Sequence, residues 1–255
     1  MITAIPHTLR QRNTNRARLV VSLGIAAFLG LTACGPAVPT QGISDPREQQ
    51  NRAVHKFNLA LDKNLVRPIA NSATKVVPVQ VQQGVVNFAD NLELPGRVVN
   101  NLLQLRLGKA VENTTRFVIN STIGIGGLFD VATAAGAPGK ATDFGETLYI
   151  WGVPEGNYVE LPALGPSTDR DALGKAVDYL LDPMKLVLPP KSRISLLASI
   201  GAQLADRGRY SETVDSILYD SADSYAQTRL FYLDHRRFNL GEAPADSSFE
   251  DPYAQ

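Results

Sequence analysis

The N-terminal stretch, residues 1–33, constrains this chain more than any other segment. Four arginines lie between positions 10 and 18, and the run from Leu19 to Ala33 carries no charge. That run is too short for a comfortable bilayer span, which needs about 20 residues. The basic flank and the short apolar run are typical of a secretory signal peptide. Residues 1–33 therefore predict an export signal that is removed from the folded protein.

The apolar run ends in Leu31-Thr32-Ala33-Cys34, and Cys34 is the only cysteine of the chain. This segment resembles a bacterial lipobox. The resemblance implies that the thiol of Cys34 receives a diacylglyceryl group, that cleavage leaves Cys34 as the first residue, and that its amine is acylated. Several acyl chains anchor a protein firmly, whereas one does not. The alternative is an ordinary signal peptide with a chance cysteine at the cut.

Charge excludes two classes of protein. The whole chain has 25 basic and 25 acidic side chains, and four of the basic ones lie in residues 1–33. The part of the chain from Cys34 onward therefore carries a small acidic excess. A nucleic-acid binder would show a basic excess, and a disordered acidic regulator would show a much larger acidic one. Apolar residues make up 44% of the chain, which is enough for a core in one large domain.

Proline and glycine divide the rest of the chain. Residues 34–45 contain several of both and predict a flexible, lipidated tether. Residues 46–240 predict one mostly α-helical domain, and the acidic residues 241–255 predict a disordered tail. Nine glycines fall between positions 124 and 165, which predicts a long loop-rich region with one short helix at 127–135.

Apolar residues recur at helical spacing on both sides of that region. A helix is expected to begin at Asp45-Pro46, to carry a stripe of Val54, Phe57, Leu61 and Leu65, and to end at Pro68. Further helices are expected at 79–92 (ending before Pro95), 95–107, 109–122, 169–181, 192–206, 211–219 and 221–238.

No motif points to catalysis or to a metal. The chain has no nucleophile elbow, no H-E-x-x-H helix and no phosphate-binding loop. His55 and His235 are expected on helix surfaces. Asp169 and Asp171 are expected to cap a helix rather than to act as acid and base. We therefore predict no catalytic residue, no metal ligand and no cofactor other than the acyl groups on Cys34.

Two features allow two interpretations each. Trp151 and Tyr158 lie among glycines, and either pack in a core or anchor the protein at the headgroup level of a bilayer. The stretch Tyr179–Leu188 is apolar on several faces. It predicts either core or an amphipathic helical hairpin in a membrane interface.

Several strings in a fixed order resemble the MlaA/VacJ family of outer-membrane lipoproteins. The resemblance runs from Ser44 to Leu188, and the sequence after Ser192 is only loosely similar. The strings are Asn51-Arg52, Phe57-Asn58 and Asp62, Arg67–Ala70, Val86–Leu92 with Pro95, Asn100–Gln104, Arg116–Ala132, Asp143–Leu148, Trp151–Val153, Gly156, Tyr158, Leu161-Pro162, Gly165–Thr168 and Arg170-Asp171.

The family resemblance implies a mostly helical ring embedded in the inner leaflet of the outer membrane, beside a trimeric porin. An amphipathic channel in the ring would let mislocalised phospholipids leave the outer leaflet for a soluble periplasmic carrier, without hydrolysis. The residue after Cys34 is Gly35 rather than Asp, which by similarity to enterobacterial sorting also favours the outer membrane. Two alternatives remain: a structural envelope lipoprotein that scaffolds a porin without moving lipid, and a lipid-modifying hydrolase.

A phospholipid headgroup needs a polar path, because its charges are costly in hydrocarbon. Charged residues next to glycines or apolar runs are our candidates for lining that channel: Asp143, Arg170, Asp171 and Lys185. Aromatic residues are our candidates for contact with acyl chains or the membrane interface: Phe57, Phe88, Phe129, Trp151 and Tyr158.

Overall fold

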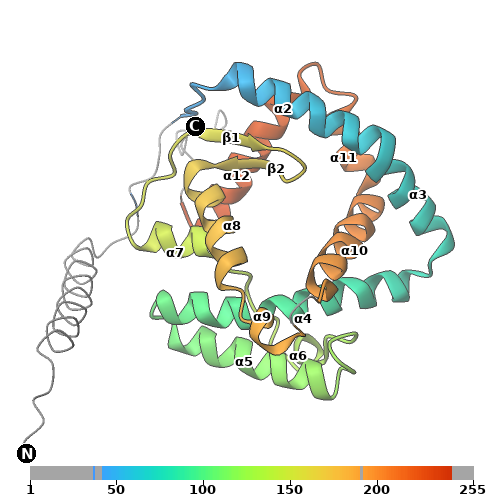
Figure 1. The fold of residues 1–255 in the computed structure, drawn as a ribbon, viewed down its shortest axis with the longest axis vertical. Helices are drawn as coiled ribbons and strands as arrows, with labels where there is room; N and C mark the ends of the chain where they lie inside the picture. The colour runs from blue at the N-terminus through green and yellow to red at the C-terminus, as the bar shows by residue number, and fades with distance from the viewer. Residues whose placement is uncertain (1–36, 38–41, 190–191, 243–255) are drawn as a thin grey trace, which may run out of the picture.

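Helices make up most of the computed structural model of the chain (Figure 1), which describes residue 37 and residues 42–189 and 192–242. The predicted mostly α fold class is therefore confirmed. The predicted signal 1–33, Cys34 and residues 243–255 of the predicted tail lie outside the described residues. The elements are α2 (Glu48–Leu61), η2 (Asp62–Val66), α3 (Arg67–Val76), α4 (Val79–Leu103), α5 (Leu107–Thr122), α6 (Val131–Ala134), α7 (Phe144–Ile150), β1 (Tyr158–Leu161), β2 (Gly165–Thr168), α8 (Asp169–Leu181), α9 (Met184–Val187), α10 (Ile194–Arg209), α11 (Ser211–Leu218) and α12 (Ser224–Leu240).

Two prolines that were expected to end helices do not end them. Pro68 lies in the first turn of α3, which follows α2 directly through the π-helical turn η2. The helical backbone runs through this junction, where the N–H of Arg67 bonds to the carbonyl of Asp62 five residues earlier, and Pro68, which has no N–H, leaves out only one hydrogen bond of the ladder. Pro95 lies inside α4, which joins two helices that were expected to be separate. The cost of an interior proline, about 3 kcal/mol, is offset by α5 and α10, which pack along α4.

The glycine-rich region is more ordered than expected. In place of one short helix it contains α6, α7 and the antiparallel hairpin β1–β2. Asp143 begins α7, because its Oδ1 accepts a hydrogen bond from the backbone N–H of Glu146 at 2.7 Å. The hairpin pairs Tyr158 with Thr168 and Leu161 with Gly165, and Gly165 has a φ of 76°. Helix α6 lies within the short helix expected at 127–135, whereas α7 and the hairpin were missed because each element has only four to seven residues, too few to show a periodic pattern.

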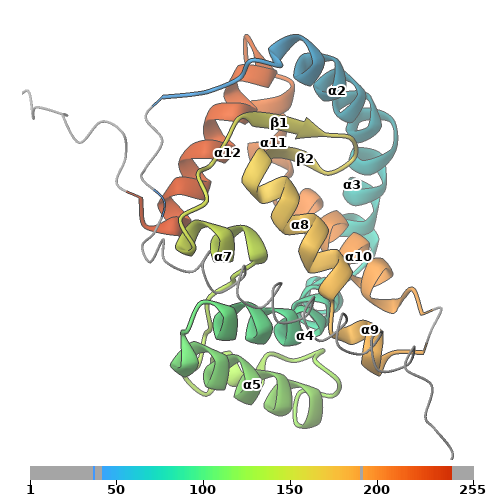
Figure 2. The ribbon, with the colours of Figure 1, turned by 60° about the vertical axis from the view of Figure 1, so that its left-hand side comes forward.

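The contacts between elements form a closed circuit, which can be followed in Figures 1 and 2. Helix α2 packs on β1 and continues through η2 into α3, and α3 packs on α10. Helix α10 packs on α4, α4 contacts α7, and α7 packs on α8. Helix α8 contacts both strands and so returns to α2, while α12 contacts β2. Each element is therefore held by neighbours that are distant in sequence.

The interior of this fold is polar and much of its exterior is apolar. On α5, Asn113, Arg116 and Asn120 are buried, while Val111 and Val118 are exposed. The apolar stripe predicted on the first helix is partly turned outward as well: Phe57 and Leu65 are 54% and 52% exposed, whereas Val54 and Leu61 are half-buried. Other exposed apolar residues are Val76, Val79, Leu105, Leu107, Ile123, Ile125, Leu128 and Phe129. No described helix has both the length and the apolar content needed to cross a membrane.

His55 corrects another expectation, because it is buried rather than solvated. Its Nδ1 lies 3.4 Å from Glu160 Oε1 and its Nε2 lies 3.1 Å from Ser224 Oγ. Glu160 also accepts hydrogen bonds from the hydroxyl of Tyr158 and the amide of Asn58. A histidine in this position joins α2 to the hairpin and to α12.

Ion pairs close the circuit at three places. Arg236 of α12 donates to both oxygens of Asp143 at 2.8 Å and to both oxygens of Asp171 at 2.9 and 3.0 Å. The other two pairs join distant elements in the same way: Arg207 of α10 with Asp62 of η2 and Asp215 of α11, and Arg237 of α12 with Glu155. Buried charges of this kind are stable only when they are paired.

The described residues of the expected flexible tether are held against the domain. The N–H of Ala37 donates to the carbonyl of Tyr149 at 2.9 Å, and Ala37 is buried. The carbonyl of Gly42 accepts from Arg237, and the carbonyl of Ser44 accepts from the N–H of Tyr158. These described residues of the expected tether therefore lie against α7, β1 and α12.

Replacement of Arg236 should destabilise the protein strongly. In Arg236→Met, the buried Asp171 loses its closest cationic partner and keeps only Arg170, whose Nε lies 3.7 Å away, so the free energy of unfolding should fall by about 3 kcal/mol. Denaturant unfolding of the purified protein in detergent, followed by circular dichroism, measures this. The control is Lys109→Met in the exposed Lys109–Glu112 pair, where we expect a change below about 1 kcal/mol. Equal losses in both variants would contradict the role given to Arg236.

Acid should remove the contribution of Asp171. Burial alone would raise its pKa, but the charge and hydrogen bonds of Arg236 outweigh burial and hold the pKa of Asp171 below its usual value. A lowered carboxyl pKa stabilises the folded state above about pH 4 and loses this effect as the pH falls further. The advantage of the wild type over Asp171→Asn should therefore shrink as the pH falls from about 5 to about 2. A constant difference across this range would contradict the prediction.

Candidate functional site

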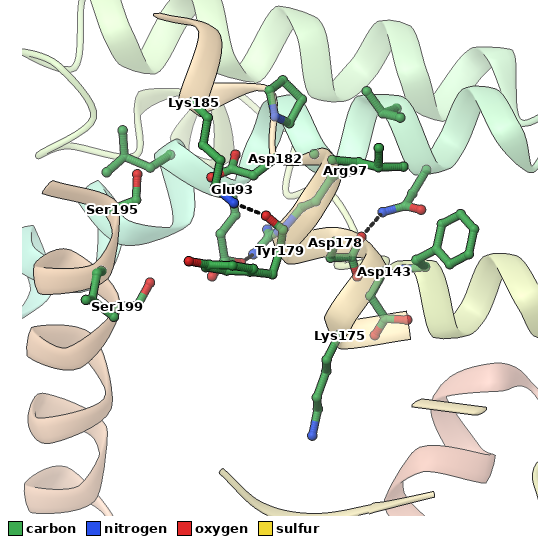
Figure 3. Close-up of a pocket in the computed structure, with 18 of the residues that line it drawn as sticks. Glu93, Arg97, Asp143, Lys175, Asp178, Tyr179, Asp182, Lys185, Ser195 and Ser199 are labelled. Carbon is green, nitrogen blue, oxygen red and sulfur yellow. Dashed lines mark hydrogen bonds and ion pairs between the residues drawn. The ribbon is translucent and has the colours of Figure 1, made fainter. Parts of the chain in front are cut away.

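A pocket of about 940 Å³ lies between α4, α8, α9 and the start of α10 (Figure 3). This volume is at the upper end of the range for ligand pockets, about 300–1,000 Å³. Charged and apolar side chains both line it. The charged ones are Glu93, Arg97, Asp143, Lys175, Asp178, Asp182, Lys185 and Arg193, and the large apolar ones include Leu92, Val99, Leu103, Phe144, Leu181, Leu188 and Leu196.

Helix α8 supplies the charged wall. The helix begins where Thr168 Oγ1 accepts a hydrogen bond from the N–H of Asp171 at 3.2 Å. Helical spacing then places Lys175, Asp178 and Asp182 on one side, and all three line the pocket. Figure 3 shows Lys175, Asp178 and Tyr179 following one another along this wall, with Lys185 beyond them.

Burial and local contacts set the charges of this wall. Burial raises the pKa of Asp178, against the hydrogen bonds that its oxygens accept from the N–H of Phe144 and the amide of Asn100, both at 2.9 Å. Burial also lowers the pKa of Lys175, although Asp171 partly opposes this shift. The Nζ of Lys185 donates to the carbonyl of Tyr179 and lies 3.6 Å from the centroid of its ring.

Two of the four predicted channel residues line this pocket, and two do not. Asp143 and Lys185 are part of its wall. Asp171 lies one helical turn before Lys175 on the same side of α8. It accepts hydrogen bonds from Arg236 and from the hydroxyl of Tyr232, which cover it. Arg170 is buried against the ring of Tyr149, 5.2 Å from its centroid. Arg170 and Asp171 therefore lie behind the pocket wall, in the ion-pair network that includes Arg236.

Sequence reasoning missed several charged residues of the pocket: Glu93, Arg97, Lys175, Asp178, Asp182 and Arg193. The charged residues of α8 could have been recognised, because charged side chains recur at positions 171, 175, 178 and 182, at the spacing of one helix face. Glu93 and Arg97 had none, since an i, i+4 pair is usual on any exposed helix.

The candidates for lipid contact fall into three groups. Phe57 and Phe129 are exposed, and Phe88 is half-buried. Trp151 is 37% exposed, and its indole N–H donates to the carbonyl of Leu103 at 3.2 Å. Tyr158 does not reach the surface, because it packs in a small core with Tyr225 and Leu233. It was predicted as a lipid contact, and the structure places it inside.

The apolar stretch after Tyr179 is exposed rather than core at its start. Tyr179, Leu180 and Leu181 are all exposed, and Tyr179 and Leu181 also line the pocket, whereas Met184 is buried. The end of α8 therefore presents exposed apolar side chains beside the charged residues of the pocket. Among the described residues, no group of three or more histidine, cysteine or acidic side chains is placed to hold a metal ion.

Known proteins resemble this chain over most of its length. The family model described as MlaA lipoprotein matches residues 43–239. The chain is 34% identical over 245 residues to the "Intermembrane phospholipid transport system lipoprotein MlaA" of Escherichia coli (strain K12), with 92% of each chain covered. The protein of the same name from Haemophilus influenzae is 29% identical over 234 residues, covering 89% of this chain and 92% of the relative.

A solved structure resembles the fold. It is described as "Structural basis for maintenance of bacterial outer membrane lipid asymmetry" and matches with a TM-score of 0.68 and 33% identity, covering 77% of this chain and 99% of the other. The family model spans most of the chain, and the Escherichia coli relative matches nine tenths of it at about a third identity. The chain therefore belongs to the MlaA lipoprotein family.

Proposed function

We propose that this protein is an outer-membrane lipoprotein that removes mislocalised phospholipids from the outer leaflet. Anchored by acyl groups on Cys34, it forms a helical ring in the inner leaflet beside a porin trimer. Phospholipids pass through an amphipathic channel in the ring and leave with a soluble periplasmic carrier. This activity maintains the lipid asymmetry of the outer membrane without chemical change to the lipid.

The observation that carries this proposal is the inverted polarity of the fold. Apolar side chains such as Leu105, Val111 and Ile125 face outward, which suits a hydrocarbon environment. Polar side chains face inward, and the circuit of contacting helices leaves a pocket lined by both charged and apolar groups. A phospholipid needs both kinds of surface, because its headgroup is charged and its acyl chains are not. Asp143 and Lys185 remain our channel candidates.

The relatives support the choice of substrate. The proteins from Escherichia coli and Haemophilus influenzae are named as lipoproteins of an intermembrane phospholipid transport system. The similar solved structure concerns outer-membrane lipid asymmetry. The alignment with the Escherichia coli protein covers about nine tenths of both chains, so the similarity includes the whole domain.

Deletion of the gene should raise the amount of phospholipid in the outer leaflet. We expect wild-type protein to restore the normal level and Cys34→Ala not to restore it, because the variant cannot be lipidated. Labelling of surface phospholipid in intact cells measures this, with immunoblots to match protein levels. An unchanged outer leaflet after deletion would rule out lipid removal as the main role, and the scaffold alternative would then lead.

Lipid hydrolysis by the purified protein tests the hydrolase alternative directly. Purified protein incubated with phospholipid vesicles should release no lysolipid or fatty acid, and any turnover above a heat-inactivated control would favour a hydrolase. Phospholipid that copurifies with the protein would count against a pure scaffold.

Trp151 should lie at the membrane interface. It is the only tryptophan of the chain, its ring is 37% exposed, and its indole N–H bonds to the carbonyl of Leu103 in the exposed end of α4. Tryptophan favours the headgroup level of bilayers. In reconstituted protein, we expect its fluorescence to be quenched more by lipids brominated near the carbonyl groups than by lipids brominated near the chain ends. Equal fluorescence in brominated and plain lipid would contradict leaflet embedding at this edge.

A further inference from the structure

The residue that closes α4 is a leucine in a conformation that favours glycine. Leu105 has a φ of 57°, in the left-handed region, and its N–H donates to the carbonyl of Leu102 at 3.0 Å. The next N–H, that of Arg106, donates to the carbonyl of Asn101 at 2.8 Å. This pair of hydrogen bonds ends many helices, and its left-handed position is usually glycine. A leucine there is strained, because its Cβ approaches the following carbonyl oxygen.

Two other helices of the chain end in the same way with glycine. Gly152 after α7 has a φ of 83° and Gly241 after α12 has a φ of 77°. In both cases the next N–H donates to a carbonyl five residues earlier, at 2.9 Å. A Cβ added at Gly241 would meet nothing within 4 Å, so lack of space does not explain the glycine there. Leu105 therefore carries a side chain at a position where the same chain elsewhere uses none.

The turn after α5 repeats this feature. Ile125 has a φ of 53°, which is a true outlier for a β-branched residue. The N–H of Gly126 donates to the carbonyl of Ser121 at 3.0 Å, and the amide of Asn91 donates to Ser121 Oγ at 3.0 Å. The turn is thus closed by its own hydrogen bonds and held from α4. Strained apolar residues lie at both ends of α5.

Neither side chain is used inside the protein. Leu105 is 84% exposed, the highest value for a large apolar residue of the described chain, and Ile125 is 64% exposed. Ala163 is the third described residue other than glycine with a positive φ, and it has only a methyl group. Strained residues persist mainly at functional sites. A contact outside the protein accounts for Leu105 and Ile125, because packing within the protein does not.

The surface between these two residues matches hydrocarbon in its charge. From Asn113 to Phe129 the chain has a single charged residue, Arg116, and that residue is buried. The exposed residues of α5 are apolar or threonine after its first turn, and α5 lies on the outside of the circuit of helices (Figures 1 and 2). We call this surface the α5 edge, and its large exposed apolar residues are Leu105, Leu107, Val111, Val118, Ile123 and Ile125.

Many polar groups of the α5 edge are satisfied within the chain. The hydroxyl of Thr122 donates to the carbonyl of Val118 at 2.6 Å, and that of Thr114 donates to the carbonyl of Ala110 at 2.8 Å. Backbone N–H groups of the turn also donate to carbonyls of the chain: those of Ile123, Gly124, Gly126, Gly127 and Phe129. Water and protein surfaces offer partners to free polar groups, whereas hydrocarbon offers none. This arrangement favours lipid over a protein partner.

We infer that Leu105 and Ile125 are fixed contacts with acyl chains and that the α5 edge faces the hydrocarbon of the leaflet directly. This inference rests on the proposed function, because it assumes that the domain lies in a membrane. The closed turns fix the direction of both side chains before contact, so little further ordering is needed when lipid covers them. The strain is thus offset by contact with the membrane and not within the fold.

The test places a spin label at each of the two positions. Cys34 is the only native cysteine and its thiol is lipidated in the proposed mature protein, so Leu105→Cys and Ile125→Cys each carry one reactive thiol. The labelled, lipidated proteins are reconstituted in vesicles of phosphatidylethanolamine and phosphatidylglycerol without porin. Power-saturation electron paramagnetic resonance then compares collisions with oxygen, which concentrates in hydrocarbon, and with a water-soluble nickel chelate.

At positions 105 and 125 we expect oxygen to relax the label several-fold more than nickel does. The control is Glu212→Cys on α11, an exposed and charged position where nickel should be the stronger relaxant. If either cysteine variant fails to fold, as judged by circular dichroism, Leu107→Cys and Val118→Cys report on the same edge.

Three results would overturn the inference. Labels at 105 and 125 that are as open to nickel as the control lie in water, and immobile labels that neither reagent reaches are covered by protein. Loss of oxygen access when porin trimers are added would make the porin the occupant of this edge. Each of these results leaves the proposed function standing if the same vesicles still show phospholipid bound to the protein, whereas wild-type protein that binds no phospholipid contradicts the proposed function itself.

Discussion

The shared ion pairs of α12 are the interaction on which the rest of the structure depends. Arg236 holds Asp143 at the start of α7 and Asp171 in the first turn of α8, and the adjacent Arg237 holds Glu155 between α7 and β1. Helix α12 is distant in sequence from α7 and α8, so these charges join it to both. Removal of one partner would leave the other buried and unpaired, which is far more costly than loss of a surface pair.

This dependence follows from where the apolar side chains lie. A water-soluble helical domain uses its leucines and valines for the core, whereas here many of them face outward and the buried aliphatic core is small. Interior positions of α4 and α5 are occupied by asparagines, such as Asn91, Asn113 and Asn120. Buried amides need hydrogen-bond partners with defined directions, which makes the packing specific but sensitive to each partner.

Sequence patterns predicted the helices that are long and periodic, and failed where tertiary contacts override local preference. The bounds of α8 were predicted correctly because Thr168 and Asp169 give a clear start and the apolar period continues to Leu181. Pro95 was misread because packing by α5 and α10 outweighs its local cost. The apolar stripe around Phe57 predicted a helix but not which side of it faces inward. The helical period of apolar residues is the same whether they face a protein core or a lipid environment. His55 was misplaced for this reason, whereas Tyr158 was misplaced because the strand β1 is too short to show a pattern.

Asp143 connects the ion-pair network of Arg236 to the pocket, and it is one of the two charged lining residues, with Lys185, that the sequence identified in advance. Its carboxylate begins α7, accepts both hydrogen bonds of Arg236 and lines the pocket wall. Lys175 and Arg193, by contrast, contribute charge to the pocket wall without beginning a helix or joining that network. Because Asp143 is paired with Arg236, its charge is already compensated within the protein. The other charges of the pocket come from α4, α8, α9 and the start of α10, where carboxylates and cations line the same wall.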